Sequence, residues 1–196
     1  MKKLLVMGLL AGLASPAMAD FPMGKVGLNM APSAKVDFDG TDDTGNGFGF
    51  YGEVGGDTLF VFADYQLSSV DFSDIDVDYK ETRVGGGLRS ASEKTTLIVR
   101  VESYKGEIDS DLGSGDDSGL GIHAGGDLAI TNTVGIYGDF GFLSLDDTDG
   151  TELRLGVRSS LTENSEVYAG YRQLSLDDSG VELDVSDIKL GINVLF

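Results

Sequence analysis

His123 is the only histidine of the chain, and it is the first residue to consider for chemistry. A single imidazole cannot build a multi-histidine metal site. The chain also has no cysteine, which removes thiol chemistry, disulfides and most structural zinc sites. We therefore expect no enzymatic activity, and we expect His123 to be a hydrogen-bonded or hydrated polar residue of its strand.

Two acidic segments could bind a hard cation. The stretches "DSDLGSGDD" (109–117) and "DDTDGTE" (146–152) place carboxylates around glycines, and oxygen ligands of this kind suit Ca²⁺. Neither stretch has the full spacing of an EF-hand loop. We expect weak, diffuse binding of Ca²⁺ or Mg²⁺ and no other cofactor. The candidate ligands are Asp109, Asp111, Asp116, Asp117, Asp146, Asp147 and Asp149.

Glycine is abundant, with 29 residues, and Gly85, Gly86 and Gly87 are consecutive. This run could suggest a phosphate-binding loop, but the Lys-Ser/Thr that opens the helix of a P-loop is missing. Bends of a barrel and close packing between strands explain these glycines better.

The formal net charge of −19 argues against nucleic acid as a partner, because phosphates require a basic surface. A charge of this size can also mark disorder. Here 41% of the residues are hydrophobic, and they follow a regular pattern, so we expect most of the chain to fold.

Alternation of apolar and polar residues dominates after the first 20 positions, and helical periodicity is absent. In "LRLGVRS", Leu153, Leu155 and Val157 share one face, and Arg154, Gly156 and Arg158 share the other. Hairpins without intervening helices form an antiparallel meander. We predict an all-β, up-and-down barrel of ten strands, with eight as the alternative. The predicted strands are 24–36, 47–55, 58–67, 77–89, 94–105, 119–130, 133–145, 151–159, 166–176 and 182–196.

The first 19 residues have the features of a secretory signal peptide. Lys2 and Lys3 precede an apolar run that is too short to span a bilayer, and an A-x-A site ends at Ala19. We expect cleavage after Ala19 and a single barrel domain over 20–196. The exported chain would then dissolve or enter a membrane as strands.

The connectors between the predicted strands alternate between two kinds. One set is mostly longer and always acidic: 37–46, 68–76, 106–118, 146–150 and 177–180. This set holds seventeen acidic residues and no Lys or Arg. Transmembrane barrels have short turns at one end and longer loops at the other. The segregation therefore favours a membrane barrel whose acidic loops face outward.

Charged residues within the strands fall on the less apolar face. A lysine or arginine that faces lipid at mid-bilayer costs about 2–4 kcal/mol, so these groups must point into the lumen of a membrane barrel. We expect an ionic network there. Its predicted members are Glu53, Arg83, Arg100, Glu102, Asp127, Asp139, Glu152, Arg154, Arg158, Arg172, Asp187 and Lys189.

The chain ends on "KLGINVLF", in which Lys189, Gly191, Val194 and Phe196 follow the spacing polar-x-Gly-x-x-apolar-x-aromatic. The stretch resembles the carboxy-terminal signal that the barrel assembly machinery reads in bacterial outer-membrane proteins. Residues 20–196 as a whole resemble the small outer-membrane β-barrels of the OmpA-membrane-domain, OmpX and porin-like superfamily. Some relatives are lipid-A deacylases with a His and a nearby Ser, but Ala124 and Gly125 follow His123 here.

The resemblance implies a bacterial outer-membrane location. Ten strands with about a dozen inward charges predict a charged, occluded lumen, and we expect a structural or cell-surface role. The expected partners are outer-membrane lipid, lipopolysaccharide and, during biogenesis, the barrel assembly machinery, and the expected state is a monomer. The acidic loops suggest that divalent ions bridge them to lipopolysaccharide. A narrow porin that prefers cations is the alternative function. A soluble exported barrel that binds an apolar ligand is the second alternative.

Overall fold

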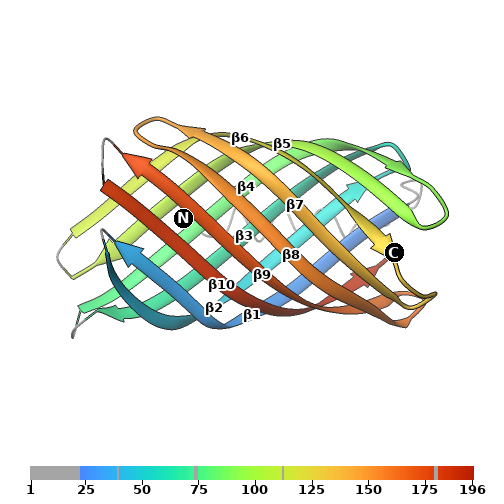
Figure 1. Cartoon of the computed structure of the whole chain (residues 1–196), viewed down its shortest axis with the longest axis horizontal. Coiled ribbons are helices and arrows are strands. Elements are labelled where there is room, and N and C mark those ends of the chain that lie inside the picture. Colours follow the sequence, from blue (N-terminus) through green and yellow to red (C-terminus); the bar gives the residue numbers. More distant parts are fainter. Residues whose placement is uncertain (1–22, 39, 73–74, 112, 179–180) are drawn as a thin grey trace, which may run out of the picture.

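The computed structural model describes residues 23–38, 40–72, 75–111, 113–178 and 181–196. Ten antiparallel strands form one closed barrel (Figure 1). The strands are β1 (Met23–Phe38), β2 (Thr41–Gly55), β3 (Leu59–Phe72), β4 (Ile75–Ala91), β5 (Thr95–Ser110), β6 (Gly113–Ala129), β7 (Val134–Leu145), β8 (Asp149–Thr162), β9 (Ser165–Asp178) and β10 (Val181–Leu195). The predicted signal peptide, 1–19, lies outside the described residues.

Each strand pairs with its neighbours in the sequence, and β1 pairs with β10 to close the barrel. This closure leaves no strand edge unpaired. The prediction of an all-β, up-and-down barrel with ten strands is confirmed, and the eight-strand alternative is wrong. Among the described residues, no helix is long and apolar enough to cross a membrane.

Pro32 lies at an irregularity of β1. The register of β1 against β10 shifts between Met30 and Ser33, and its register against β2 shifts between Ala31 and Ala34. Proline lacks the N–H that a ladder hydrogen bond needs, so the strand bulges at this point. The bulge lets β1 continue to Phe38 with both neighbours.

The apolar side chains point away from the barrel axis. On β5 the outward residues Leu97, Val99 and Val101 are all at least half exposed, whereas the inward Glu102 is 2% exposed. Further along the same outward face come Ser103, Lys105 and Glu107. The outer surface therefore carries an apolar belt, and beyond the belt the strands continue with polar outward residues.

Most residues of the acidic segments that the structure describes lie in strands, which corrects the prediction of long acidic loops. Residues 106–110 pair with 113–117, and at most three residues separate consecutive strands at this end of the barrel. We call this the acidic end, and the opposite end, where β1 starts and β10 finishes, the terminal end. The acids break the alternation but not the backbone ladder, because each strand still satisfies its neighbour's N–H and C=O groups. The asymmetry between the ends lies in strand extension, since the connectors at the terminal end have two to four residues.

Several glycines make room for aromatic rings inside the barrel. The rings of Phe62 and Phe60 lie against Gly85 and Gly87, where an added Cβ would overlap neighbouring atoms. Tyr137 covers Gly156 and Gly170 in the same way. Close packing, and not a phosphate loop, is thus the structural setting of the glycine run.

Candidate functional site

The lumen has three layers along the barrel axis. A hydrophobic plug fills the lumen toward the acidic end. Its members are Val36, Val70, Tyr79, Tyr104, Leu143, Leu174, Leu176 and Val185, and each is at most 6% exposed. The inward positions of seven strands thus supply a small apolar core inside a barrel whose outside is also apolar. These side chains pack against one another across the lumen, as in the core of a soluble protein.

An ionic layer lies below the plug, and Arg83 is its centre. Arg83 donates to Glu152 through both terminal nitrogens, at 2.6 and 2.9 Å, and to Glu81 and Glu102 at 2.9 and 3.0 Å. Arg83 and its three carboxylates are each at most 2% exposed. Charges this deeply buried are tolerated only when they are paired and hydrogen-bonded, as they are here.

Arg172 extends the ionic layer toward β10. Its Nε donates to Asp187 at 2.8 Å, and its Nη1 donates to Glu81. Tyr104 connects the layer to the plug, because its hydroxyl donates to Glu81 at 2.9 Å and also contacts the Tyr79 hydroxyl. The guanidinium of Arg83 lies over the Tyr104 ring at 4.8 Å.

His123 belongs to the same layer and is 1% exposed. Its Nε2 lies 3.2 Å from Glu102, and its Nδ1 faces Asp139 at 3.5 Å. Glu102, His123 and Glu152 present ligand atoms within 4.8 Å of one another, a geometry that could hold a metal ion. Arg83 already pairs with both of these glutamates, so a cation would compete with its guanidinium.

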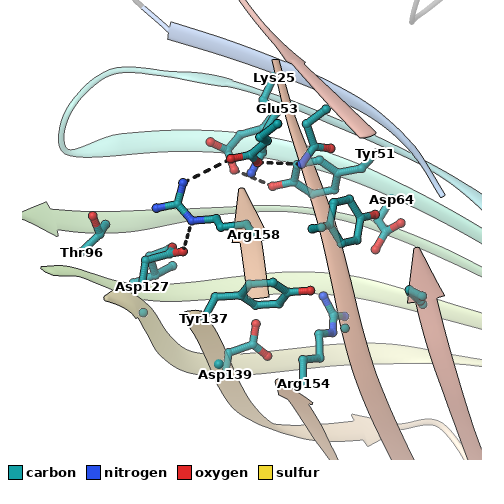
Figure 2. Close-up of a pocket in the computed structure, with 18 of the residues that line it drawn as sticks. Lys25, Tyr51, Glu53, Asp64, Thr96, Asp127, Tyr137, Asp139, Arg154 and Arg158 are labelled. Atoms are coloured by element: carbon teal, nitrogen blue, oxygen red, sulfur yellow. Dashed lines mark hydrogen bonds and ion pairs between the residues drawn. The ribbon is translucent and has the colours of Figure 1, made fainter. Parts of the chain in front are cut away.

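The third layer is a cavity of about 390 Å³ between the ionic layer and the terminal end. Figure 2 shows Lys25, Tyr51 and Glu53 on one wall, and Tyr137, Asp139 and Arg154 on the opposite wall. Further ion pairs line it, such as Arg89 with Glu53 and Arg158 with Asp127. Seven basic and five acidic side chains line the cavity, which makes it locally basic in a strongly acidic chain.

No family model matches the chain, and no curated protein matches its sequence. Solved structures do match. Neisserial surface protein A has a TM-score of 0.55 at 13% identity and covers 87% of this chain and 96% of its own. The chain has the fold of the small outer-membrane β-barrels.

Two further structures have this fold. The attachment invasion locus protein Ail of Yersinia pestis has a TM-score of 0.50 at 18% identity, with 89% of this chain and 98% of Ail covered. The β domain of the Bordetella autotransporter BrkA has a TM-score of 0.55 at 13% identity, with 90% and 100% covered. At these identities the likeness concerns the fold alone.

In this outer-membrane-type barrel, eleven of the twelve residues predicted for the lumen network form ion pairs. They are Glu53, Arg83, Arg100, Glu102, Asp127, Asp139, Glu152, Arg154, Arg158, Arg172 and Asp187. Lys189 lines the cavity, but it makes no ion pair or hydrogen bond with any described residue.

Sequence reasoning missed three members of these ion pairs. Glu81 and Arg89 lie on β4 with the same inward parity as Arg83, and Glu166 shares the inward parity of Arg172 on β9. Their parity was the signal that could have found them. The plug was harder to predict from the sequence. Its apolar residues lie in strand segments whose outward positions are acidic, so the apolar-outward alternation is lost there.

The seven predicted metal ligands do not gather at one point. Asp109 pairs with Lys80, and Asp116 pairs with Lys105, both at 3.3 Å. Hydrogen bonding to Glu107 and Asp116 raises the pKa of Lys105. Among the described residues, no three of the seven bring ligand atoms within 4.8 Å of one another.

Asp117 differs from the other acids because its carboxylate holds a connection between strands in place. Its carboxylate accepts the backbone N–H groups of Ser118, Asp146 and Asp147, and it accepts the Thr148 hydroxyl at 2.7 Å. It therefore holds the connection between β7 and β8 against β6. The remaining predicted ligands, Asp111 and Asp149, lie in the same acidic end.

The four residues of the predicted assembly signal lie along the seam between β10 and its neighbours. Lys189 and Gly191 point inward, and the Tyr168 ring lies against Gly191. Val194 and Phe196 point outward and are 47% and 55% exposed. The backbone of Phe196 exchanges two hydrogen bonds with Gly24, at 2.6 and 3.0 Å, so the last residue helps to close the barrel.

Proposed function

We propose that the protein is an integral outer-membrane β-barrel with an occluded lumen and a structural or cell-surface role that involves no catalysis. The observation that carries this proposal is the inversion of polarity. Apolar side chains cover the outer belt, and charges fill the interior. Such an outer belt needs lipid around it, and a closed barrel satisfies its backbone without water.

The same inversion argues against the soluble alternative. A soluble barrel that binds an apolar ligand would bury its apolar face and expose its charges. Here Leu120, Ile122 and Phe142 are all more than half exposed on adjacent strands, whereas Arg83 and Glu152 are buried. In water, an apolar surface that runs around the whole barrel would far exceed the patches that soluble monomers tolerate.

The narrow cation porin is supported less well than a barrel with an occluded lumen. Its acidic end would favour cations at the mouth. An ion that passed this mouth would meet the plug and then a layer in which Arg83 is bound by three carboxylates. Neither layer offers a continuous row of hydrated sites.

We further propose that the acidic end contacts lipopolysaccharide through divalent ions, with outer-membrane lipid around the belt. Ail was solved with a heparin analogue, sucrose octasulfate. The dense carboxylates of this chain disfavour direct binding of such a polyanion. If shared ions form the contact, EDTA should lower the thermal stability of the barrel in lipopolysaccharide-containing vesicles and leave it unchanged in detergent. Equal effects in both media would contradict the bridging role.

Cell fractionation tests the location. We expect the protein in the outer-membrane fraction, released only by detergent, and migrating faster in gels when it is not boiled. A periplasmic protein of known location, followed in the same preparation, controls for leakage between fractions. Recovery of the barrel in the soluble periplasmic fraction would contradict the proposal.

A further inference from the structure

Three cations meet at the floor of the lumen cavity. Arg154 of β8 lies directly across from Arg172 of β9, and Lys189 of β10 lies one inward position beyond Asp187, the cross-strand partner of Arg172. All three line the cavity.

Each of these cations keeps a donor nitrogen without a partner among the described residues. Arg172 is 3% exposed, and its Nη2 is buried and unpaired. The Nε of Arg154 is also buried and unpaired. Lys189 makes no hydrogen bond or ion pair there. The two buried arginine donors are costly without an acceptor, and like charges gathered at one place repel one another.

The carboxylates nearby do not meet this demand. Glu152 and Asp187 already accept from the other nitrogens of Arg154 and Arg172. Asp64 is the one carboxylate of the cavity lining that forms no ion pair with a described residue. Asp64 and the unpaired Oδ1 of Asp187 are thus the carboxylate acceptors left for the unmatched donors of three cations.

Aromatic rings rise above this floor. Tyr137 and Tyr168 meet edge to face with their centroids 6.5 Å apart, and Tyr51 lines the opposite wall. Tyr137 also lies next to Arg154 in Figure 2. Small-ligand sites combine a concave volume, aromatic walls and a few convergent polar groups, and a volume of about 390 Å³ suits a small molecule.

We propose that this cavity binds a small aromatic anion. The acid group, a carboxylate or a phosphate monoester, accepts from Arg154, Arg172 and Lys189 at the floor. The ring lies against Tyr137 and Tyr168. The ligand enters from the terminal end, because the ionic layer and the plug close the other side. Binding requires no membrane, so this inference stands apart from the proposed location.

Calorimetric titration of the purified protein, refolded in detergent, tests the site. The probe is phenyl phosphate, with micelles of identical composition in cell and syringe. We expect one molecule per barrel. Phenol should show no binding, because it lacks the acid group, and inorganic phosphate should bind more weakly, because it lacks the ring. Phosphate that bound as tightly as phenyl phosphate would overturn the aromatic assignment.

Two variants with opposite expected effects on affinity separate a change in binding from a defect in folding. Lys189→Gln should weaken phenyl phosphate binding about tenfold, the effect of one charge-assisted hydrogen bond. Asp64→Asn should strengthen binding, because it removes a competing negative charge. Lys94→Gln, at an exposed position in the connector after β4, is the matched control and should bind as the wild type does.

Heat-modifiable migration shows that each variant is folded before titration. Unchanged affinity in both Lys189→Gln and Asp64→Asn would overturn the proposal. The proposal would also be overturned if the heat of titration scaled with the detergent concentration and not with the protein concentration.

Discussion

Arg83 shows how a single residue organises the interior. Four of its hydrogen bonds reach three carboxylates on β4, β5 and β8, so one guanidinium ties together strands from separate parts of the barrel wall. Buried ion pairs of this kind add little stability over apolar packing, but they penalise the loss of either partner severely. The penalty makes the layer testable one residue at a time.

Glu152→Gln should lower the free energy of unfolding by about 3–5 kcal/mol. The substitution keeps the shape of the side chain but leaves Arg83, Arg154 and Arg172 with one carboxylate fewer. Urea unfolding in detergent or vesicles measures the change. Glu107→Gln is the matched control. Its pair with Lys105 is about half exposed, so we expect a loss below about 1 kcal/mol. Equal losses in the two variants would contradict the ionic layer as described.

Asp76 provides a pH-dependent contact at the acidic end, outside the apolar belt. Protonated Asp76 donates a hydrogen bond to the Asp71 carboxylate, and this bond, together with charge repulsion from the same residue, raises the pKa of Asp76. A carboxyl whose pKa is raised by folding binds its proton more tightly in the folded state. Acid therefore stabilises the β3–β4 hairpin, and this stabilisation is lost as the pH rises through the raised pKa.

Asp76→Asn should consequently increase amide protection in the hairpin at pH 7 and change it little in acid. Protection factors of the paired residues Val70 and Val77 report the effect by hydrogen exchange. Wild-type protection that does not change with pH, alongside an unchanged variant, would count against the Asp71–Asp76 contact.

At the scale of elements, glycines on one strand make room for rings on the next. Gly141 of β7 lies opposite His123 of β6, and a Cβ at Gly141 would overlap the imidazole. Gly141→Ala should therefore cost about 1–3 kcal/mol in the free energy of unfolding, as overpacking does. The cost should shrink when His123→Ala is introduced as well.

Gly115 is the matched control for this substitution, since a Cβ there would meet no atom within 4 Å. We expect Gly115→Ala to change stability by less than about 0.5 kcal/mol. A similar cost at Gly115 and Gly141 would show that the ring does not decide the effect.

Phe196 belongs to the closing pair of strands, and it has two separable parts. Its backbone completes the seam with Gly24, and its ring is the aromatic position of the assembly signal. Phe196→Ala keeps the backbone hydrogen bonds. It should lower outer-membrane assembly in cells more than it slows refolding in detergent. Equal effects on assembly and refolding would make the ring a packing residue only.

Much of the element structure could be predicted from sequence. The alternation around Leu153–Val157 assigned both the strands and their inward face, because parity in a strand is a local property. The partner of each charge could not be assigned, since Arg83 and Glu152 lie 69 residues apart and meet only through barrel closure. The strand extensions escaped prediction because their acidic residues have low β propensity, which neighbouring strands override.

At the scale of the whole molecule, the layers give the barrel a direction. Acidic strand extensions lead to an apolar plug, then to a neutralised ionic layer, and finally to a basic cavity at the terminal end. A barrel with ten strands could hold water if its inward side chains were small. Here large residues such as Tyr104, Leu174 and Arg83 are fully buried in the lumen. The central claim is therefore that the protein is a membrane barrel with an occluded lumen.

Planar-bilayer recording of the refolded protein tests this claim most directly. Heat-modifiable migration shows that the protein used for the recording is folded. A porin of known conductance, inserted in the same way, serves as the positive control. We expect no stable unitary currents at either polarity, because the plug and the ionic layer interrupt the lumen. Reproducible unitary currents, carried preferentially by cations, would contradict the occluded lumen and favour the narrow porin.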